Sequence, residues 1–322
     1  MLLKLVEYHW PEHIDDALLL LGRLDTKTVP LAGGTYLLGL QDESIEAVVD
    51  LRDLDLSYIS EDARGVHIGA MTTLQQMADD PLLKELAAGL LARAALLSAS
   101  SRLIRNSATL GGTLGAGPAS QADLLTALVA LDAAVVVRSG SKTQVDLSGG
   151  TYERPGLPLT GVVYRGKQER QIASRAFQME RRARELIVEV IVPRPGLACG
   201  ASLLRVGRTP SDAAWVNAAA RIEIVDGAYQ HVRLVLGGVN MEPERVDAVE
   251  AALTGKPVQQ PFNNRALVEA LQAGMNSFRP PSDSLVSGSY RRVSGMNMAY
   301  RVLEEAMTIA YWRSVVSSEK GE

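Results

Sequence analysis

The stretch VPLAGGTYLL, residues 29–38, decides the fold together with a second stretch, IRNSATLGGT, residues 104–113. Each is an apolar, strand-like run that breaks into a glycine pair followed by a threonine. Glycine allows positive φ and lets a ligand approach the backbone without a Cβ in the way. Consecutive N–H groups in such a turn form an anion-binding concavity. Two such turns could hold a pyrophosphate from both sides, so a dinucleotide cofactor is the leading interpretation. Taken alone, each turn could instead be a tight connection between strands or a bulge.

Composition and charge indicate an ordered globular protein. The chain has 322 residues, of which 47% are hydrophobic and 22% charged, enough for two domains or more. A net charge of −4 and a pI of about 5.7 do not fit a protein that binds nucleic acid. The N-terminus has no signal-peptide pattern, and no apolar run approaches the ~20 residues that span a bilayer. We therefore expect a cytoplasmic protein without a membrane span.

The cysteine and histidine content bears on redox chemistry. Cys199 is the single cysteine, and one thiol cannot bind an iron–sulfur cluster or a structural zinc ion. The four histidines are scattered, so we assign no metal, and any metal redox centre must belong to another chain. A basic stretch over residues 175–184 indicates either a solvated helix face or a binding edge for an acidic partner.

Hydrophobic periodicity predicts the elements between these motifs. Residues 82–99 are expected to form one long helix, and residues 139–175 loops and short strands. Asp226-Gly227 predicts a hairpin between strands at 219–225 and 232–239. Pro193 and Pro195 mark a domain boundary. The remaining expected strands are 2–8, 29–32, 47–51, 66–71, 133–137 and 186–192, and the remaining expected helices are 11–21, a helix capped by Thr72 or Thr73, 118–132, 243–253, 263–276 and about 290–316.

The ordered succession of motifs resembles the FAD-binding medium subunit of molybdenum hydroxylases, the family that includes carbon monoxide dehydrogenase and xanthine dehydrogenase. The resemblance covers nearly the whole chain. Its pieces are the two glycine motifs, VVDLR at 48–52, HIGAMT at 67–72, ALVALDA at 127–133, LRVGR at 204–208, LGGV at 236–239 and SYRR at 289–292.

The resemblance implies an α+β fold in three parts. Residues 1–55 and 56–195 would be two subdomains of a vanillyl-alcohol-oxidase-like FAD-binding domain. Residues 196–322 would form a C-terminal domain with an antiparallel sheet of about three strands and a helical bundle.

The resemblance also implies a set of cofactor contacts and no catalytic residue. Backbone donors around the FAD diphosphate would come from both glycine motifs, Asp123 would bind sugar or ribityl hydroxyls, and Ile104 would pack near the flavin. Arg205 stands where relatives often carry lysine and would place a cation beside the flavin, while Glu185 and Leu186 would contact the adenine or flavin ring. The implied motif residues are Ala32, Gly33, Gly34, Thr35, Tyr36, Leu37, Thr109, Gly111, Gly112 and Thr113.

The implied function is electron transfer within a larger complex, a two-fold heterohexamer. A molybdenum-cofactor large subunit would oxidise the substrate, a [2Fe–2S] small subunit would carry the electrons to FAD, and an acceptor such as NAD, a quinone or O2 would take them. A stand-alone FAD-dependent oxidoreductase is the first alternative. The second is a non-catalytic assembly protein that retains the fold.

Overall fold

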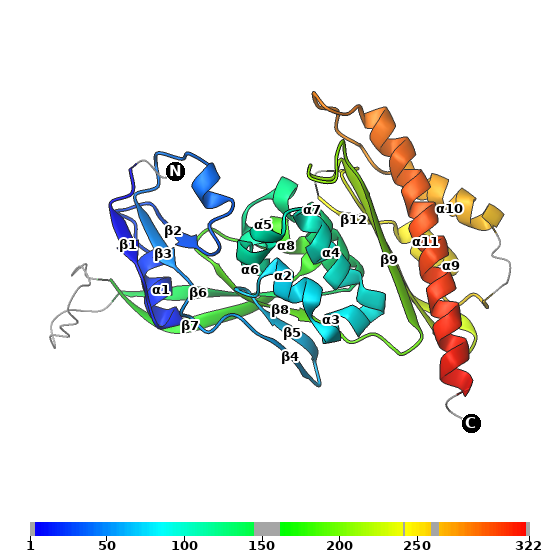
Figure 1. Ribbon diagram of the computed structural model, residues 1–322, viewed down its shortest axis with the longest axis horizontal. Coiled ribbons are helices and arrows are strands. Elements are labelled where there is room, and N and C mark those ends of the chain that lie inside the picture. Colours follow the sequence, from blue (N-terminus) through cyan, green and yellow to red (C-terminus); the bar gives the residue numbers. More distant parts are fainter. Residues whose placement is uncertain (1–3, 145–161, 241, 259–263, 320–322) are drawn as a thin grey trace.

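The computed structural model describes residues 4–144, 162–240, 242–258 and 264–319. The fold is α+β, with three sheets that follow one another along the long axis of the molecule (Figure 1). The stretches 1–55, 56–195 and 196–322 each contain one complete sheet, and we keep them as the proposed divisions of the chain. Among the described residues, no helix combines the length and apolar character needed to cross a membrane.

The N-terminal sheet is parallel and has the order β1-β3-β2. Its strands are β1 (Glu7–His9), β2 (Thr28–Leu31) and β3 (Ala47–Asp50). Helix α1 (Ile14–Leu21) buries Ala17, Leu18, Leu20 and Leu21 and ends at Gly22, as the sequence predicts. After β2 the chain turns through a short 3-10 helix, η1 (Leu37–Gly39).

The second sheet is antiparallel, with the order β4-β5-β8-β6-β7. Its strands are β4 (Ile59–Asp62), β5 (Gly65–Gly69), β6 (Ala134–Gln144), β7 (Val162–Ala173) and β8 (Leu186–Val192). The expectation of loops and short strands over 139–175 is wrong for its described parts, because β6 and β7 pair from Ala134↔Ala173 to Gln144↔Val162. Residues 145–161 lie outside the described part of the chain.

Helices pack on this sheet and form the largest core cluster. The expected helix over 82–99 is broken: Ala87 and Ala88 have φ of 45° and 55°, and the chain divides there. Thr73, not Thr72, is the N-cap of α2, and it forms a capping box with Gln76. The elements are α2 (Leu74–Asp79), α3 (Pro81–Glu85), η2 (Leu86–Gly89), α4 (Leu90–Ser98), α5 (Arg102–Ser107), α6 (Leu110–Gly115), α7 (Pro118–Ala130), η3 (Ser174–Ala176) and α8 (Phe177–Glu180).

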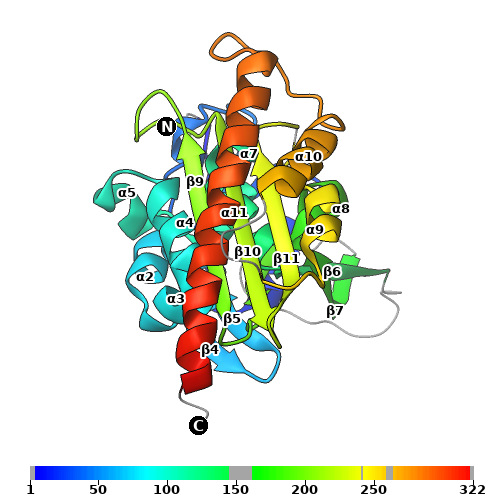
Figure 2. The ribbon, with the colours of Figure 1, turned by 90° about the vertical axis from the view of Figure 1, so that its right-hand side faces the viewer.

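The C-terminal sheet has four strands rather than three, in the order β12-β11-β10-β9. They are β9 (Cys199–Val206), β10 (Val216–Val225), β11 (Ala228–Gly237) and the two-residue β12 (Glu244–Arg245). The β10–β11 hairpin at Asp226-Gly227 is confirmed. Helices α9 (Asp247–Leu253), α10 (Asn264–Met275) and α11 (Gly288–Glu319) follow, and α11 runs along the outer face of the sheet (Figure 2).

Both faces of the C-terminal sheet are buried. Ala218 and Ala220 belong to the core cluster that contains residues of α11, whereas Ala219 belongs to the cluster shared with α4 and α7. Because side chains alternate along a strand, β10 joins two cores. A Cβ on Gly200 of β9 would lie 2.1 Å from the Ala306 carbonyl oxygen of α11, so this strand and helix touch backbone to backbone.

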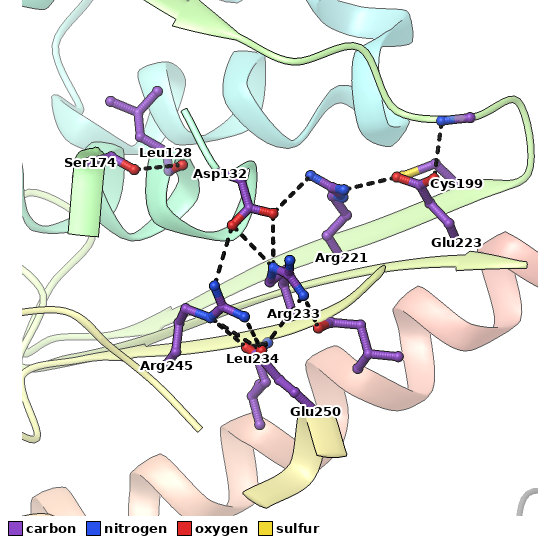
Figure 3. Close-up of polar contacts among 12 residues, drawn as sticks. Leu128, Asp132, Ser174, Cys199, Arg221, Glu223, Arg233, Leu234, Arg245 and Glu250 are labelled. Atoms are coloured by element: carbon purple, nitrogen blue, oxygen red, sulfur yellow. Dashed lines mark hydrogen bonds and ion pairs between the residues drawn. The ribbon is translucent and has the colours of Figure 1, made fainter. Parts of the chain in front are cut away.

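An ionic cluster joins the end of α7 to the C-terminal sheet (Figure 3). Its members are Asp132, Arg221, Glu223, Arg233, Arg245 and Glu250. An Asp132 carboxylate oxygen lies 2.8 Å from Nε of Arg233, and NH1 atoms of Arg245 and Arg221 lie 3.4 Å and 3.7 Å from the carboxylate. Arg221 also pairs with Glu223, and Arg245 pairs with Glu250. Three arginines thus meet three carboxylates at the junction between the second and third sheets.

Candidate cofactor site

The two glycine motifs lie directly against each other, although they are far apart in the sequence. A Cβ on Gly33 would lie 1.6 Å from the carbonyl oxygen of Ser107, so only glycine fits there. A Cβ on Gly112 would lie 3.4 Å from the Cβ of Ala32, and one on Gly117 would lie 4.0 Å from the Tyr36 hydroxyl. The close approach of the two segments therefore depends on glycine at the point of contact.

The first motif presents unpartnered backbone donors. Strand β2 ends at Leu31, and Gly34 has a φ of +70°. Within the described parts of the chain, the N–H groups of Gly33, Gly34, Thr35 and Tyr36 meet no hydrogen-bond acceptor. Ala32, Gly33 and Gly34 are partly buried, as is Leu37, while Thr35 and Tyr36 are exposed. Such a run of free amides around a left-handed residue is suited to an anion.

The second motif differs from the sequence-based expectation, because it is helical. Thr109 is the N-cap of α6, and its hydroxyl accepts a hydrogen bond from the Gly112 N–H over 3.0 Å. The Gly111 N–H donates to the Ala70 carbonyl over 2.8 Å, and the Thr113 N–H donates to the Thr109 carbonyl. These amides are engaged within the chain, so the motif supplies close packing in place of the expected backbone donors.

Asp123 and Arg205, two of the expected cofactor residues, form an ion pair with each other. Arg205 Nε lies 3.3 Å from an Asp123 carboxylate oxygen, and Asn217 donates to Asp123 over 2.7 Å. Burial raises the pKa of Asp123, and the nearby Arg205 opposes that rise. The remaining Arg205 nitrogens donate to the carbonyls of Leu97, Pro210 and Asp212. Each of the three guanidinium nitrogens thus has a protein partner, and the place of Arg205 beside a flavin stays a prediction.

Glu185 and Leu186 also have partners inside the chain. Arg170 forms a bidentate pair with Glu185, with Nε and NH2 at 2.9 Å and 3.0 Å, and the Arg182 N–H donates to the same carboxylate. These contacts hold the pKa of Glu185 below its usual range, although burial opposes them. Leu186 is 2% exposed, in the core cluster shared by α1 and β8. Both residues therefore act in packing β7, β8 and α1 together.

An apolar surface borders the two motifs. Ile104 on α5 is 44% exposed, Tyr36 is 43% exposed, and the neighbouring Leu103 is 80% exposed. Sequence patterning did not single out Leu103, and its only signal is an apolar residue beside Ile104 in a short helix. Exposed aliphatic and aromatic side chains beside free amides can receive a ring system attached to a phosphate.

A depression of about 490 Å³ lies between Tyr58, Asp79, Asp80 and Asn106. It is lined by carboxylates and amides and has no cationic side chain, so it does not suit a diphosphate. Among the described residues, no group of three or more histidine, cysteine, aspartate or glutamate side chains is arranged to hold a metal ion.

Comparisons with known proteins give a consistent result. The family described as FAD binding domain in molybdopterin dehydrogenase matches residues 4–152, and the CO dehydrogenase flavoprotein C-terminal domain matches residues 204–306. The glyceraldehyde dehydrogenase medium chain of Sulfolobus acidocaldarius is 27% identical, over 87% of this chain and 91% of that protein. The carbon monoxide dehydrogenase medium chain of Afipia carboxidovorans is 28% identical, over 93% and 96%. A solved carbon monoxide dehydrogenase from Hydrogenophaga pseudoflava superposes with a TM-score of 0.79 at 26% identity, covering 95% of this chain and 98% of that one.

Proposed function

The chain belongs to the family of FAD-binding medium subunits of molybdenum hydroxylases, and from this premise we propose that it holds FAD at the two glycine motifs and relays electrons through it. The observation that carries the proposal is the turn at Gly33–Tyr36, whose four N–H groups are unpartnered in the described chain. A turn of this kind has no structural need for so many free donors, and a diphosphate would satisfy them.

The residues around the turn fit the cofactor. Gly33 and Gly112 leave room that a Cβ would fill, so the first motif can pack closely against the end of α5 and the start of α6 while its amides stay available to a ligand. Tyr36 and Ile104 offer exposed apolar surface for a ring. We assign the diphosphate to the amides of Gly33–Tyr36, with Ala32 and Leu37 flanking them. Thr109, Gly111, Gly112 and Thr113 support this turn, and Asp123, Arg205, Glu185 and Leu186 fix the framework behind it.

Bound FAD would supply the redox chemistry that no side chain of this protein offers. The chain's own task is to bind and orient the cofactor, and such a task needs no general base. We propose that electrons arrive from a [2Fe–2S] small subunit reduced by a molybdenum-cofactor large subunit, and leave to an external acceptor. This chain has a single cysteine, whereas an iron–sulfur cluster needs several cysteine ligands, so the cluster must lie on a partner subunit under this proposal.

A visible absorption spectrum of the purified chain, recorded before and after addition of FAD and removal of the excess, tests the cofactor proposal. A flavin spectrum close to one FAD per chain is the expected result. A chain that stays colourless, and also takes up no FAD after co-expression with its partner subunits, would refute the proposal and favour an assembly protein.

The electron-transfer role needs a second experiment. The FAD-loaded chain should not oxidise an organic substrate by itself, and it should co-purify with a subunit that contains iron and acid-labile sulfide. Substrate oxidation by the isolated, FAD-loaded chain would instead establish a stand-alone oxidoreductase.

A further inference from the structure

Arg181 is a cation that lies beside α6 without a carboxylate partner. Its NH1 atom donates to the Gly115 carbonyl over 3.4 Å. The two acids nearest in sequence, Glu180 and Glu185, both pair with Arg170 instead. No carboxylate in the described chain forms an ion pair with Arg181. Arginines that are taken out of water usually have an anionic partner, because an unpaired charge is costly to desolvate.

Arg181 and the first glycine motif both lie against α6. Gly112 and Gly115 are three residues apart on this helix and so share a face. Gly112 faces Ala32, and Gly115 faces Arg181, whose NH2 atom would lie 3.8 Å from a Cβ at that glycine. The next glycine, Gly117, faces the Tyr36 hydroxyl. The guanidinium and the first glycine motif thus border one strip of α6 and the turn after it.

Two further observations concern the same short helix. The amide nitrogen of Gln178, one turn before Arg181 on α8, is buried and has no acceptor in the described residues. Burial also lowers the pKa of the Arg181 guanidinium, and the charge of Glu185 opposes this shift only in part. The Arg181 guanidinium lies over the Phe177 ring, 5.8 Å from its centroid, but has no carboxylate partner. A cation without an anion and a buried amide donor without an acceptor, three residues apart, both favour an acceptor-rich ligand.

We propose that Arg181 is a cofactor-binding residue whose guanidinium contacts the diphosphate of the FAD held by the amides of Gly33–Tyr36; the inference rests on the proposed function. Guanidinium binds phosphate oxygens through charge-assisted hydrogen bonds, and it supplies the positive charge that backbone amides lack. Arg181 follows the matched FAD-binding segment, which ends at residue 152. Arg181 belongs to the basic stretch 175–184 that suggested a binding edge, and it would face the cofactor.

The test compares Arg181→Gln with Arg182→Gln in the full chain. Arg182 is the exposed neighbour, and only its backbone N–H has a partner in the turn. Each cofactor-free protein is titrated with FAD and, separately, with riboflavin, which has no phosphate. Flavin fluorescence gives the dissociation constants, and thermal unfolding without ligand checks the fold.

We expect Arg181→Gln to weaken FAD binding about tenfold, or ~1.4 kcal/mol, with riboflavin affinity and the unfolding midpoint unchanged. Arg181→Lys should recover part of the loss, and Arg182→Gln should match the wild type. FAD affinity unchanged in Arg181→Gln overturns the inference and leaves the proposed function standing. An equal loss for FAD and riboflavin also overturns it, because it assigns Arg181 a structural role. A wild-type chain that takes up no FAD overturns both proposals.

Discussion

Replacing Asp132 with asparagine should destabilise the junction between α7 and the C-terminal sheet. Asparagine keeps the shape of the side chain and tolerates the left-handed backbone at this position, where φ is 54°. The substitution therefore removes the charge and little else. The cluster of three arginines and three carboxylates would then carry one uncompensated positive charge, next to an Arg221 side chain that is only 6% exposed.

The magnitude follows from this burial. Removing one partner of a buried pair costs about 3–5 kcal/mol. Asp132 is one-third exposed, and Glu250 still pairs with Arg245, so part of that cost is relieved by water and by the second carboxylate. We expect a loss of about 2–3 kcal/mol, or a fall in the unfolding midpoint of roughly 4–12 °C.

Thermal unfolding followed by circular dichroism at neutral pH measures the effect. The matched control is Glu43→Gln, which removes the charge from a pair with Lys4 whose side chains are 60% and 65% exposed, and it should change stability by less than about 1 kcal/mol. If Asp132→Asn unfolds at the same temperature as the control, the cluster does not stabilise the junction and the reasoning is refuted.

Three other predictions concern the site and its framework. Gly33→Ala should abolish FAD uptake or destabilise the chain by about 1–3 kcal/mol or more, because the new Cβ would overlap the Ser107 carbonyl oxygen. The control Gly39→Ala, whose new Cβ would have nothing within 4 Å, should leave both the FAD stoichiometry and the unfolding midpoint unchanged. Equal behaviour of the two variants would contradict the packing argument. Burial raises the pKa of Asp123, so the folded chain binds the carboxyl proton more tightly than the unfolded chain does, and this stabilisation is lost as pH rises from the ordinary aspartate pKa of about 4 through the raised pKa. Asp123→Asn should therefore flatten this part of the curve of unfolding midpoint against pH. An unchanged slope would show that other groups cause the pH dependence. Burial raises the pKa of the Cys199 thiol to about 12, so the folded protein should not react with a thiol reagent at pH 8 until denaturant is added, and rapid labelling of the native chain would contradict the buried position.

Local sequence signals were sufficient for much of the fold. The Asp226-Gly227 turn has a single good solution as a hairpin, and Gly22 ends α1 where the apolar stripe stops. In contrast, the break at Ala87 and Ala88 was missed: Gly89, with a φ of 77°, follows it directly, but the two alanines themselves have left-handed backbone, which alanine rarely adopts. Residues 139–144 and 162–173 form long paired strands that carry polar side chains, so their hydrophobic pattern was weak.

The cofactor site also has parts that the sequence predicted and parts that it did not. The first glycine motif is a turn after a strand, as its residues predict, and its free amides follow from that geometry. The second motif was interpreted as another strand and turn, but its glycines lie in the first turn of α6, where they let the helix approach Ala70 and Ala32. Glycine serves turns and close contacts alike, and the sequence alone does not separate the two uses. The partners of Arg205 and Glu185 depend on which elements meet in space, so sequence reasoning could not assign them.

The backbone contact between Gly200 and α11 has a consequence for biosynthesis. Strands β9, β10 and β11 are translated well before α11, and their face toward that helix carries the buried residues Ala218, Ala220, Ile222, Leu234 and Leu236. On the ribosome this face stays open to water until α11 has been made. The nascent chain therefore passes through a stage with a finished cofactor-binding half and an uncovered apolar sheet, and at that stage it should need a chaperone most.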